Sequence, residues 1–84
     1  MSDDAARILV VDDVPENVRL LEAVLAAHGY EVVSATDGQT ALDLALSAKP
    51  DLVLLDVMMP GMSGYDVCRA IRADPACAVL PVVP

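Results

Sequence analysis

The sequence RILVVDD at residues 7–13 and the sequence DLVLLD at residues 51–56 share one pattern, a short apolar run that ends in aspartate. Neither run alternates between apolar and polar residues, and both are rich in valine, isoleucine and leucine. Such runs are typical of parallel strands that helices cover on both faces. We therefore predict two buried strands with carboxylates at their carboxyl ends.

Helical patterns separate these strands. Three stretches carry apolar residues at helical spacing between residues that can begin and end a helix. The first helix is expected from Pro15 to His28, and the second from Thr36 or Asp37 to Lys49. The third is expected from Ser63 to about Ala73. Two further short runs, at residues 31–34 and 79–83, have the composition of strands.

The order of these elements predicts an α/β fold. Strands and helices alternate as β-α-β-α-β-α-β, and each crossover is long enough for parallel pairing. We expect a doubly wound parallel sheet of the flavodoxin-like type, with strand order 2-1-3-4. It forms one domain over residues 1–84, of which residues 1–6 are a polar leader. The 56% content of hydrophobic residues agrees with strands that are buried on both faces.

The composition argues against nucleic acid or an anionic membrane as the main partner. Thirteen acidic and five basic residues give a formal charge of −8, which repels nucleic acid and anionic membranes. With two tyrosines and no phenylalanine or tryptophan, base stacking is also disfavoured. The chain shows neither a secretory signal nor a membrane-spanning run. The spacing of Cys68 and Cys77 matches no zinc pattern. Because no export signal is visible, we expect reduced thiols and a cytoplasmic location.

Three carboxylates are expected at one edge of the sheet. In the strand order 2-1-3 the first and third strands are neighbours, and their carboxyl ends border the switch point where ligands bind. Asp12 and Asp13 follow the first strand, and Asp56 follows the third. Like charges at such a place repel one another, and a divalent cation removes that cost. Hard oxygen ligands favour Mg²⁺, and Asp56 is the best candidate nucleophile because a carboxylate can form an acyl phosphate.

These residues also fit other interpretations. Aspartates also end strands as turn formers, but two such endings with Met-Met-Pro-Gly beyond the second favour a site. Glu16 and Asn17 lie in the first helical turn, where a solvated surface and a functional contact are equally open. A hydrolase of the haloacid dehalogenase type would need Asp-x-Asp after the first strand, where this chain has Val14. A flavin mononucleotide binder would need a first loop rich in serine, threonine or glycine.

The segments ILVVDDVPENVRLLEAVL, PDLVLLDVMMPGMSGYDVCRAIR and LPVV resemble the receiver domains of response regulators, over residues 7–83. The string LLDVMMPGMSG is the most specific part of the resemblance. The resemblance implies that Asp56 is the phosphoacceptor and Asp13 the principal metal-binding carboxylate. It further implies that Asp12 reaches the metal through water and that Met58 ligates it through the backbone carbonyl. Pro60 and Gly61 match the loop that shapes the pocket.

The resemblance also implies partners. A receiver takes its phosphoryl group from a histidine kinase or a phosphotransfer protein and regulates an attached output domain, and is not itself classed as an enzyme. The segments VDDVPENVRLLE and CRAIRADP are similar to receivers that precede output domains which synthesise cyclic di-GMP. The alternative is a non-catalytic interaction module, which predicts a homo-oligomer and no phosphate chemistry.

One departure from the family concerns the carboxyl-terminal part. Receivers carry a threonine or serine after the fourth strand and a lysine after the fifth, and this sequence ends at Pro84, before both. The fourth helix, fifth strand and fifth helix are also missing. We therefore expect a fragment of a receiver with impaired phosphorylation. We also expect apolar surface beside the first helix, which favours self-association.

Overall fold

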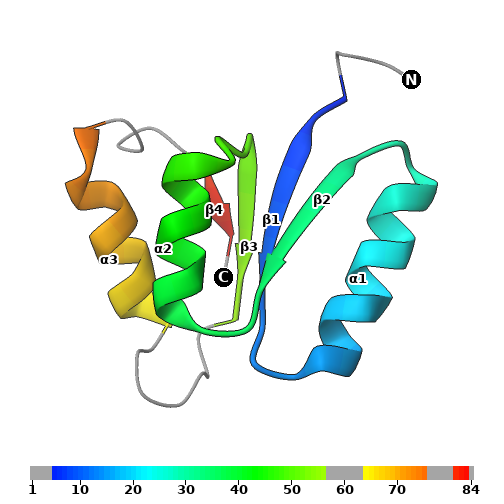
Figure 1. Cartoon of the computed structure of the whole chain (residues 1–84), viewed down its shortest axis with the longest axis horizontal. Helices are drawn as coiled ribbons and strands as arrows, with labels where there is room; N and C mark the ends of the chain where they lie inside the picture. Colours follow the sequence, from blue (N-terminus) through cyan, green and yellow to red (C-terminus); the bar gives the residue numbers. More distant parts are fainter. Residues whose placement is uncertain (1–4, 57–63, 76–80, 84) are drawn as a thin grey trace.

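The computed structural model describes residues 5–56, 64–75 and 81–83, which form a sheet with helices on both faces (Figure 1). The elements are β1 (Arg7–Val11), α1 (Pro15–Ala27), β2 (Glu31–Ala35), α2 (Gly38–Ser47), β3 (Leu52–Leu55), α3 (Gly64–Ala73) and β4 (Val82–Val83). Helix α1 covers one face of the sheet, and α2 and α3 lie together on the other. Among the described residues, no helix has the length and apolar character needed to cross a membrane.

The sheet has the predicted topology. Its order is β2-β1-β3-β4, and each of the three strand pairs is parallel. In the register of the central strands, Val11 of β1 lies opposite Leu55 of β3 and also opposite Ala35 of β2. The residues that follow Val11 and Leu55 therefore leave the sheet side by side at its carboxyl edge.

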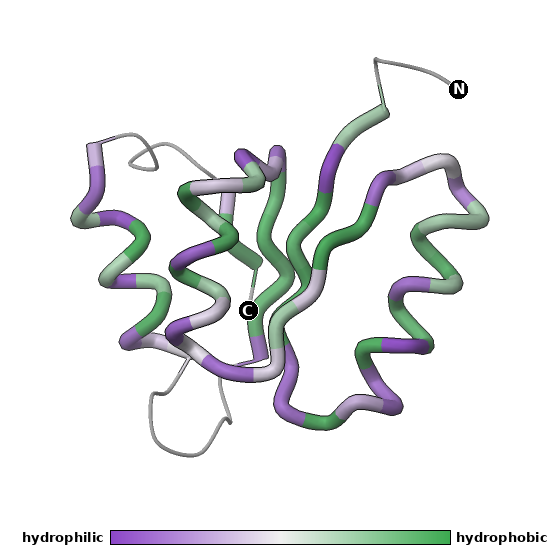
Figure 2. The backbone as a smooth tube through the Cα atoms, in the orientation of Figure 1, coloured by the Kyte–Doolittle hydropathy of each residue, from purple (hydrophilic) through white to green (hydrophobic). Residues whose placement is uncertain are grey.

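The main hydrophobic core lies between the sheet and the pair α2 and α3. Small residues of α2, Ala41 and Ala45, let this helix approach the strands closely, and both are buried. Val67 and Ile71 of α3 complete this layer as the sequence pattern predicts. The other buried members are Leu9, Val11, Ala35, Val53 and Leu55. Figure 2 shows the strands as the most hydrophobic part of the chain, between helices that carry polar residues.

Helix α1 ends in a left-handed turn, as Gly29 predicts. Gly29 has φ +86°, a conformation that residues with a Cβ rarely adopt. The Gly29 N–H donates to the Ala26 carbonyl at 3.0 Å, and the Tyr30 N–H donates to the Leu25 carbonyl at 3.1 Å. These two bonds form a Schellman motif, which satisfies carbonyl groups that the helix itself leaves without partners.

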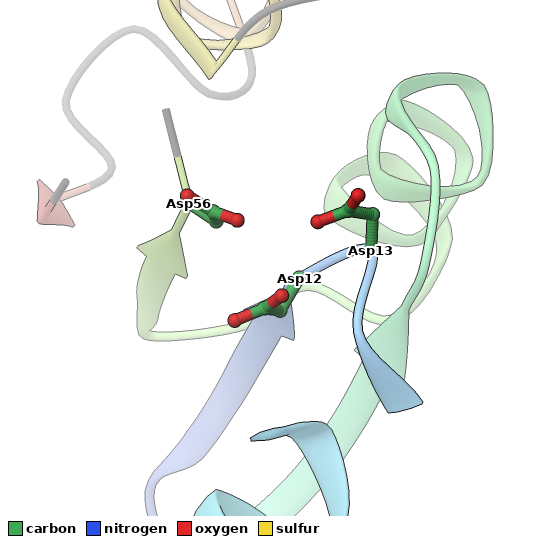
Figure 3. Close-up of side chains that lie close together, drawn as sticks. All are labelled: Asp12, Asp13 and Asp56. Atoms are coloured by element: carbon green, nitrogen blue, oxygen red, sulfur yellow. The ribbon is translucent and has the colours of Figure 1, made fainter. Parts of the chain in front are cut away.

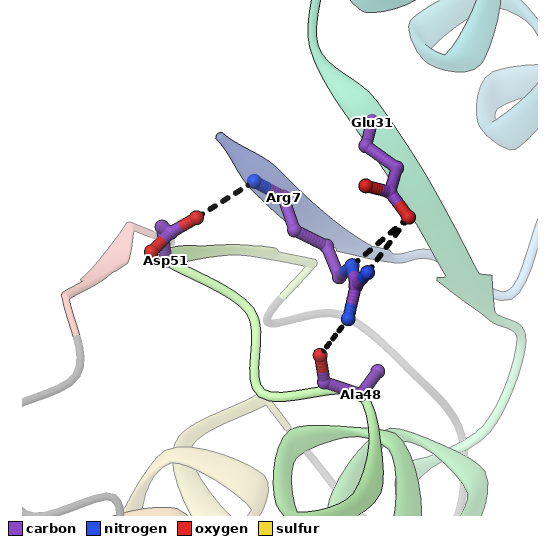
Figure 4. A network of polar contacts seen from close by, with 4 residues as sticks. All are labelled: Arg7, Glu31, Ala48 and Asp51. Carbon is purple, nitrogen blue, oxygen red and sulfur yellow. Dashed lines mark hydrogen bonds and ion pairs between the residues drawn. The ribbon is translucent and has the colours of Figure 1, made fainter. Parts of the chain in front are cut away.

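Arg7 ties together four elements at the amino edge of the sheet (Figure 4). Its guanidinium donates to Glu31 at the start of β2, with an ion-pair distance of 2.8 Å, and to the carbonyl of Ala48 after α2. Its backbone N–H donates to the Asp51 carboxylate at 2.8 Å, just before β3. This arrangement places a cation at the negative end of α2 and fixes the starts of three strands.

Several boundaries differ from the sequence predictions. β3 begins at Leu52, one residue later than predicted, although the Asp51 N–H donates to the Arg7 carbonyl at 2.7 Å. Within the described residues β4 comprises Val82 and Val83 and leaves out Pro81, which has no N–H to donate. Residues 79–80 and Ser63 lie outside the described residues. The apolar stripes are also narrower than expected, since Leu20 is 65% exposed and Leu46 is 48% exposed.

Candidate metal centre

Three carboxylates gather at the carboxyl edge of the sheet. One oxygen each from Asp12, Asp13 and Asp56 lies within 4.8 Å of the others, and all three residues are half-buried. Figure 3 shows that Asp13 and Asp56 point toward one another and that the Asp12 carboxylate lies beside them. The predicted juxtaposition of the ends of β1 and β3 is therefore present.

The backbone of the sheet holds two of these aspartates in place. The Asp56 N–H donates to the Val11 carbonyl at 2.9 Å, which extends the β1–β3 ladder by one bond. The Asp12 N–H donates to the Ala35 carbonyl at 3.1 Å, which extends the β1–β2 ladder in the same way. The spacing of the two side chains is thus set by strand pairing rather than by flexible loops.

Asp12 is also held through its side chain. One carboxylate oxygen accepts from the Val14 N–H at 2.9 Å, and the other accepts from the Asn17 side-chain amide at 3.2 Å. The sequence is compatible with Asn17 as either a solvated helix residue or a functional contact. The structure places Asn17 against the site, whereas Glu16 lies near Arg19 at 3.7 Å on the exposed side of α1.

The cluster fits a hard divalent cation. Three carboxylates supply oxygen ligands, which suit Mg²⁺, and the half-exposed positions leave room for the water molecules that Mg²⁺ retains. The predicted backbone ligand, Met58, lies outside the described residues, as do Pro60 and Gly61. Of the predicted metal ligands, the structure therefore describes the three aspartates that follow β1 and β3.

An apolar groove adjoins the cluster on the sheet face that α1 leaves open. It has a volume of about 190 Å³. Its lining residues are Val11, Leu21, Leu54, Leu55, Asp56 and Val83. This groove agrees with the apolar surface that the sequence predicts beside the first helix, α1.

The fold and the acidic edge together define a receiver domain. The family model for the response regulator receiver domain matches residues 8–83, so this chain belongs to that family. The chain is 60% identical over 79 residues to the response regulator PleD of Caulobacter vibrioides. The aligned residues cover 94% of this chain and 17% of PleD. It thus spans less than a fifth of the length of that curated relative.

Solved structures agree with this assignment. The chemotaxis response regulator CheY4 of Vibrio cholerae superposes with a TM-score of 0.89 at 35% identity, covering 93% of this chain and 65% of that one. The response regulator TrrA of Thermotoga maritima, in complex with Mg²⁺-BeF, superposes with a TM-score of 0.77 at 47% identity. This match covers 81% of this chain and 59% of the TrrA chain. A chain in the structure of the histidine kinase ThkA with TrrA matches with a TM-score of 0.83 at 42% identity. This match covers 92% of this chain and 65% of that one.

Proposed function

We propose that Asp56 accepts a phosphoryl group and that Asp12, Asp13, Asp56 and the Met58 carbonyl hold the Mg²⁺ that the reaction needs. The observation that carries this proposal is the approach of the three carboxylates to within 4.8 Å at the ends of two neighbouring strands. Such a cluster is unfavourable without a cation, because every pair of its charges repels. The membership of the chain in the receiver family supports the same assignment.

The chemistry follows from the position of Asp56. A carboxylate oxygen of Asp56 attacks the phosphorus of the donor, and the bond between phosphorus and the donor breaks with its electron pair on the leaving group. The product is an acyl phosphate on Asp56. Bound Mg²⁺ supplies positive charge that offsets the charge of the phosphoryl oxygens. The hydrogen bond from the Asp56 N–H to Val11 keeps the attacking side chain at the edge of the sheet.

The expected donor is a histidine kinase or a phosphotransfer protein in the cytoplasm, and the expected target of the signal is an attached output domain. The solved complex between TrrA and the histidine kinase ThkA supports a kinase as donor, because this chain resembles TrrA. The likeness to one segment of the longer PleD supports an attached domain. Proteins of this kind act as phosphoacceptors, and we assign no further catalytic activity to this chain.

A labelling experiment tests the proposal. The 84-residue chain is incubated with acetyl phosphate and Mg²⁺, and intact-mass spectrometry measures the gain of one phosphoryl group. A slow, partial gain is expected for the wild-type chain, in keeping with the impaired phosphorylation expected from the sequence, and an equal gain is expected for Asp43→Asn, a control on the exposed face of α2. It is expected to vanish in Asp56→Asn and when EDTA removes Mg²⁺. Normal labelling of Asp56→Asn would overturn the proposal.

The apolar groove favours a second candidate function, association of two copies of the chain. Val83 at its border is 47% exposed, so contact with a second molecule would remove apolar surface from water. Sedimentation velocity would then show a concentration-dependent dimer that Val83→Glu dissociates. Leu46→Glu is the matched control, because Leu46 is 48% exposed on α2, away from the groove. A wild-type chain that stays monomeric at high concentration contradicts this candidate.

A further inference from the structure

Asn17 makes a contact with the acidic cluster that its place in the helix does not require. The residue lies in the first turn of α1, and its backbone N–H already donates to the Val14 carbonyl at 3.0 Å. The side-chain amide donates across to the carboxylate of Asp12 at 3.2 Å. Asparagine is a poorer helix former than alanine, so this position gives up some helix propensity.

The two oxygens of Asp12 are held by groups of different origin. The Val14 N–H comes from the backbone at the start of α1, and the Asn17 amide is a side chain. Either bond alone leaves the carboxylate free to turn about its last torsion. The two bonds together fix its plane, so that its remaining lone pairs keep one direction relative to Asp13 and Asp56.

Electrostatic repulsion makes this restraint matter. With three carboxylates within 4.8 Å, the Asp12 carboxylate lowers its energy by turning away from the other two. The N–H dipole of Asn17 opposes that rotation and places partial positive charge beside the carboxylate. For Asp13, in contrast, the structure gives no side-chain hydrogen bond or ion pair to another described residue.

We infer that Asn17 is a positioning residue of the Mg²⁺ site, which acts by orienting the Asp12 carboxylate. The inference rests on the proposed function, because it assumes that the cluster binds Mg²⁺. Outer partners of metal ligands commonly change metal affinity by about 10- to 100-fold. The half-exposed position of Asp12 puts the expected effect of Asn17→Ala at the lower end, about a tenfold weaker affinity.

A double-mutant cycle tests this role with a binding readout. Isothermal titration with Mg²⁺ is carried out on the 84-residue wild-type chain, Asn17→Ala, Asp12→Ala and the double variant. If Asn17 acts through Asp12, Asn17→Ala weakens binding in the wild-type background and has no further effect once Asp12 is alanine. An equal loss in both backgrounds would show a merely structural role and overturn the inference.

A matched control and a spectroscopic readout complete the test. Gln39 donates its side-chain amide to Asp43 at 3.2 Å on α2, so Gln39→Ala removes a bond of the same length and chemistry that involves none of the three clustered aspartates. This control is expected to bind Mg²⁺ like the wild-type chain. In NMR spectra, the Asn17 side-chain amide resonances are expected to shift in Asp12→Ala, and unchanged resonances would contradict the contact.

The outcomes separate the two proposals. A wild-type chain that binds Mg²⁺ with the same affinity as Asn17→Ala overturns the role of Asn17 and leaves the proposed function in place. A wild-type chain that does not bind Mg²⁺ overturns both. Circular dichroism of each variant without metal confirms that a loss of affinity does not come from unfolding.

Discussion

Replacing Asp13 by asparagine is expected to stabilise the metal-free chain and to destabilise the chain in saturating Mg²⁺, relative to the wild type. Asn has nearly the shape of Asp without its charge, so the substitution removes repulsion inside the cluster together with one metal ligand. Asp13 is the best site for this experiment because its side chain forms no hydrogen bond within the described residues, whereas Asp12 forms two.

The size of the metal-free effect follows from the distances. Two charges 4.8 Å apart repel by about 0.9 kcal/mol in water and by about 3.5 kcal/mol at an effective dielectric constant of about 20. Asp12 and Asp13 are neighbours in the unfolded chain as well, so only the approach of Asp56 is created by folding. Salt with a Debye length of about 8 Å roughly halves the lower value. For a half-buried cluster we expect a gain of about 1 kcal/mol.

Thermal unfolding monitored by circular dichroism measures this gain. For a chain of this length, about 1 kcal/mol corresponds to a rise in Tm of about 4–8 °C. With Mg²⁺ at about 100 times its dissociation constant, the wild-type chain gains about 2.7 kcal/mol, and Asp13→Asn is expected to lose most of that gain. The order of the two Tm values therefore inverts between EDTA and Mg²⁺.

Asp43→Asn controls for the change in net charge, because it also removes one acidic group from the chain but lies on the exposed face of α2. Its Tm is expected to stay close to that of the wild type and to respond to Mg²⁺ in the same way. The reasoning is refuted if Asp13→Asn lowers Tm in EDTA, or if its response to Mg²⁺ equals that of Asp43→Asn.

Three further predictions concern stability. Gly29→Ala is expected to lower the free energy of unfolding by about 1 kcal/mol, because Gly29 has φ +86°, and urea unfolding with an unchanged m-value would verify it. Arg7→Ala is expected to lower the free energy of unfolding by about 1–2 kcal/mol, because it removes the partly exposed bonds to Glu31 and Ala48. Arg7→Lys is expected to restore only part of this loss, because lysine lacks the planar guanidinium. Full recovery of the free energy of unfolding in chemical denaturation would contradict this. Hydrogen bonds from the backbone and side chain of Thr40 lower the pKa of Asp37 below its usual 3.8. The stabilisation by these bonds is present above pH 3.8 and is lost as the pH falls through the pKa of Asp37 in the folded chain. Asp37→Asn keeps an N-cap without the charge, so its Tm is expected to fall less than that of the wild type as the pH is lowered. Identical profiles of Tm against pH for the two chains would disprove this.

The core illustrates where reading of the pattern succeeded and where it did not. The spacing of Ala41, Ala45, Val67 and Ile71 predicted their burial correctly, because residues three or four apart share one face of a helix. Leu20 fits the α1 stripe equally well in the sequence but is 65% exposed. Periodicity shows which residues lie on one face, but the depth of each residue depends on how the helix is tilted over the sheet.

The sequence by itself determined the order of the elements, their parallel pairing and the three aspartates at the strand ends. These features follow from local periodicity, from turn residues such as Gly29, and from the rule that parallel strands end at one edge. Only the tertiary structure decided that Asn17 faces Asp12 and that Arg7 joins α2 to the strands. Such contacts link side chains whose directions depend on how helices dock against the sheet, and no short-range pattern in the chain encodes that docking.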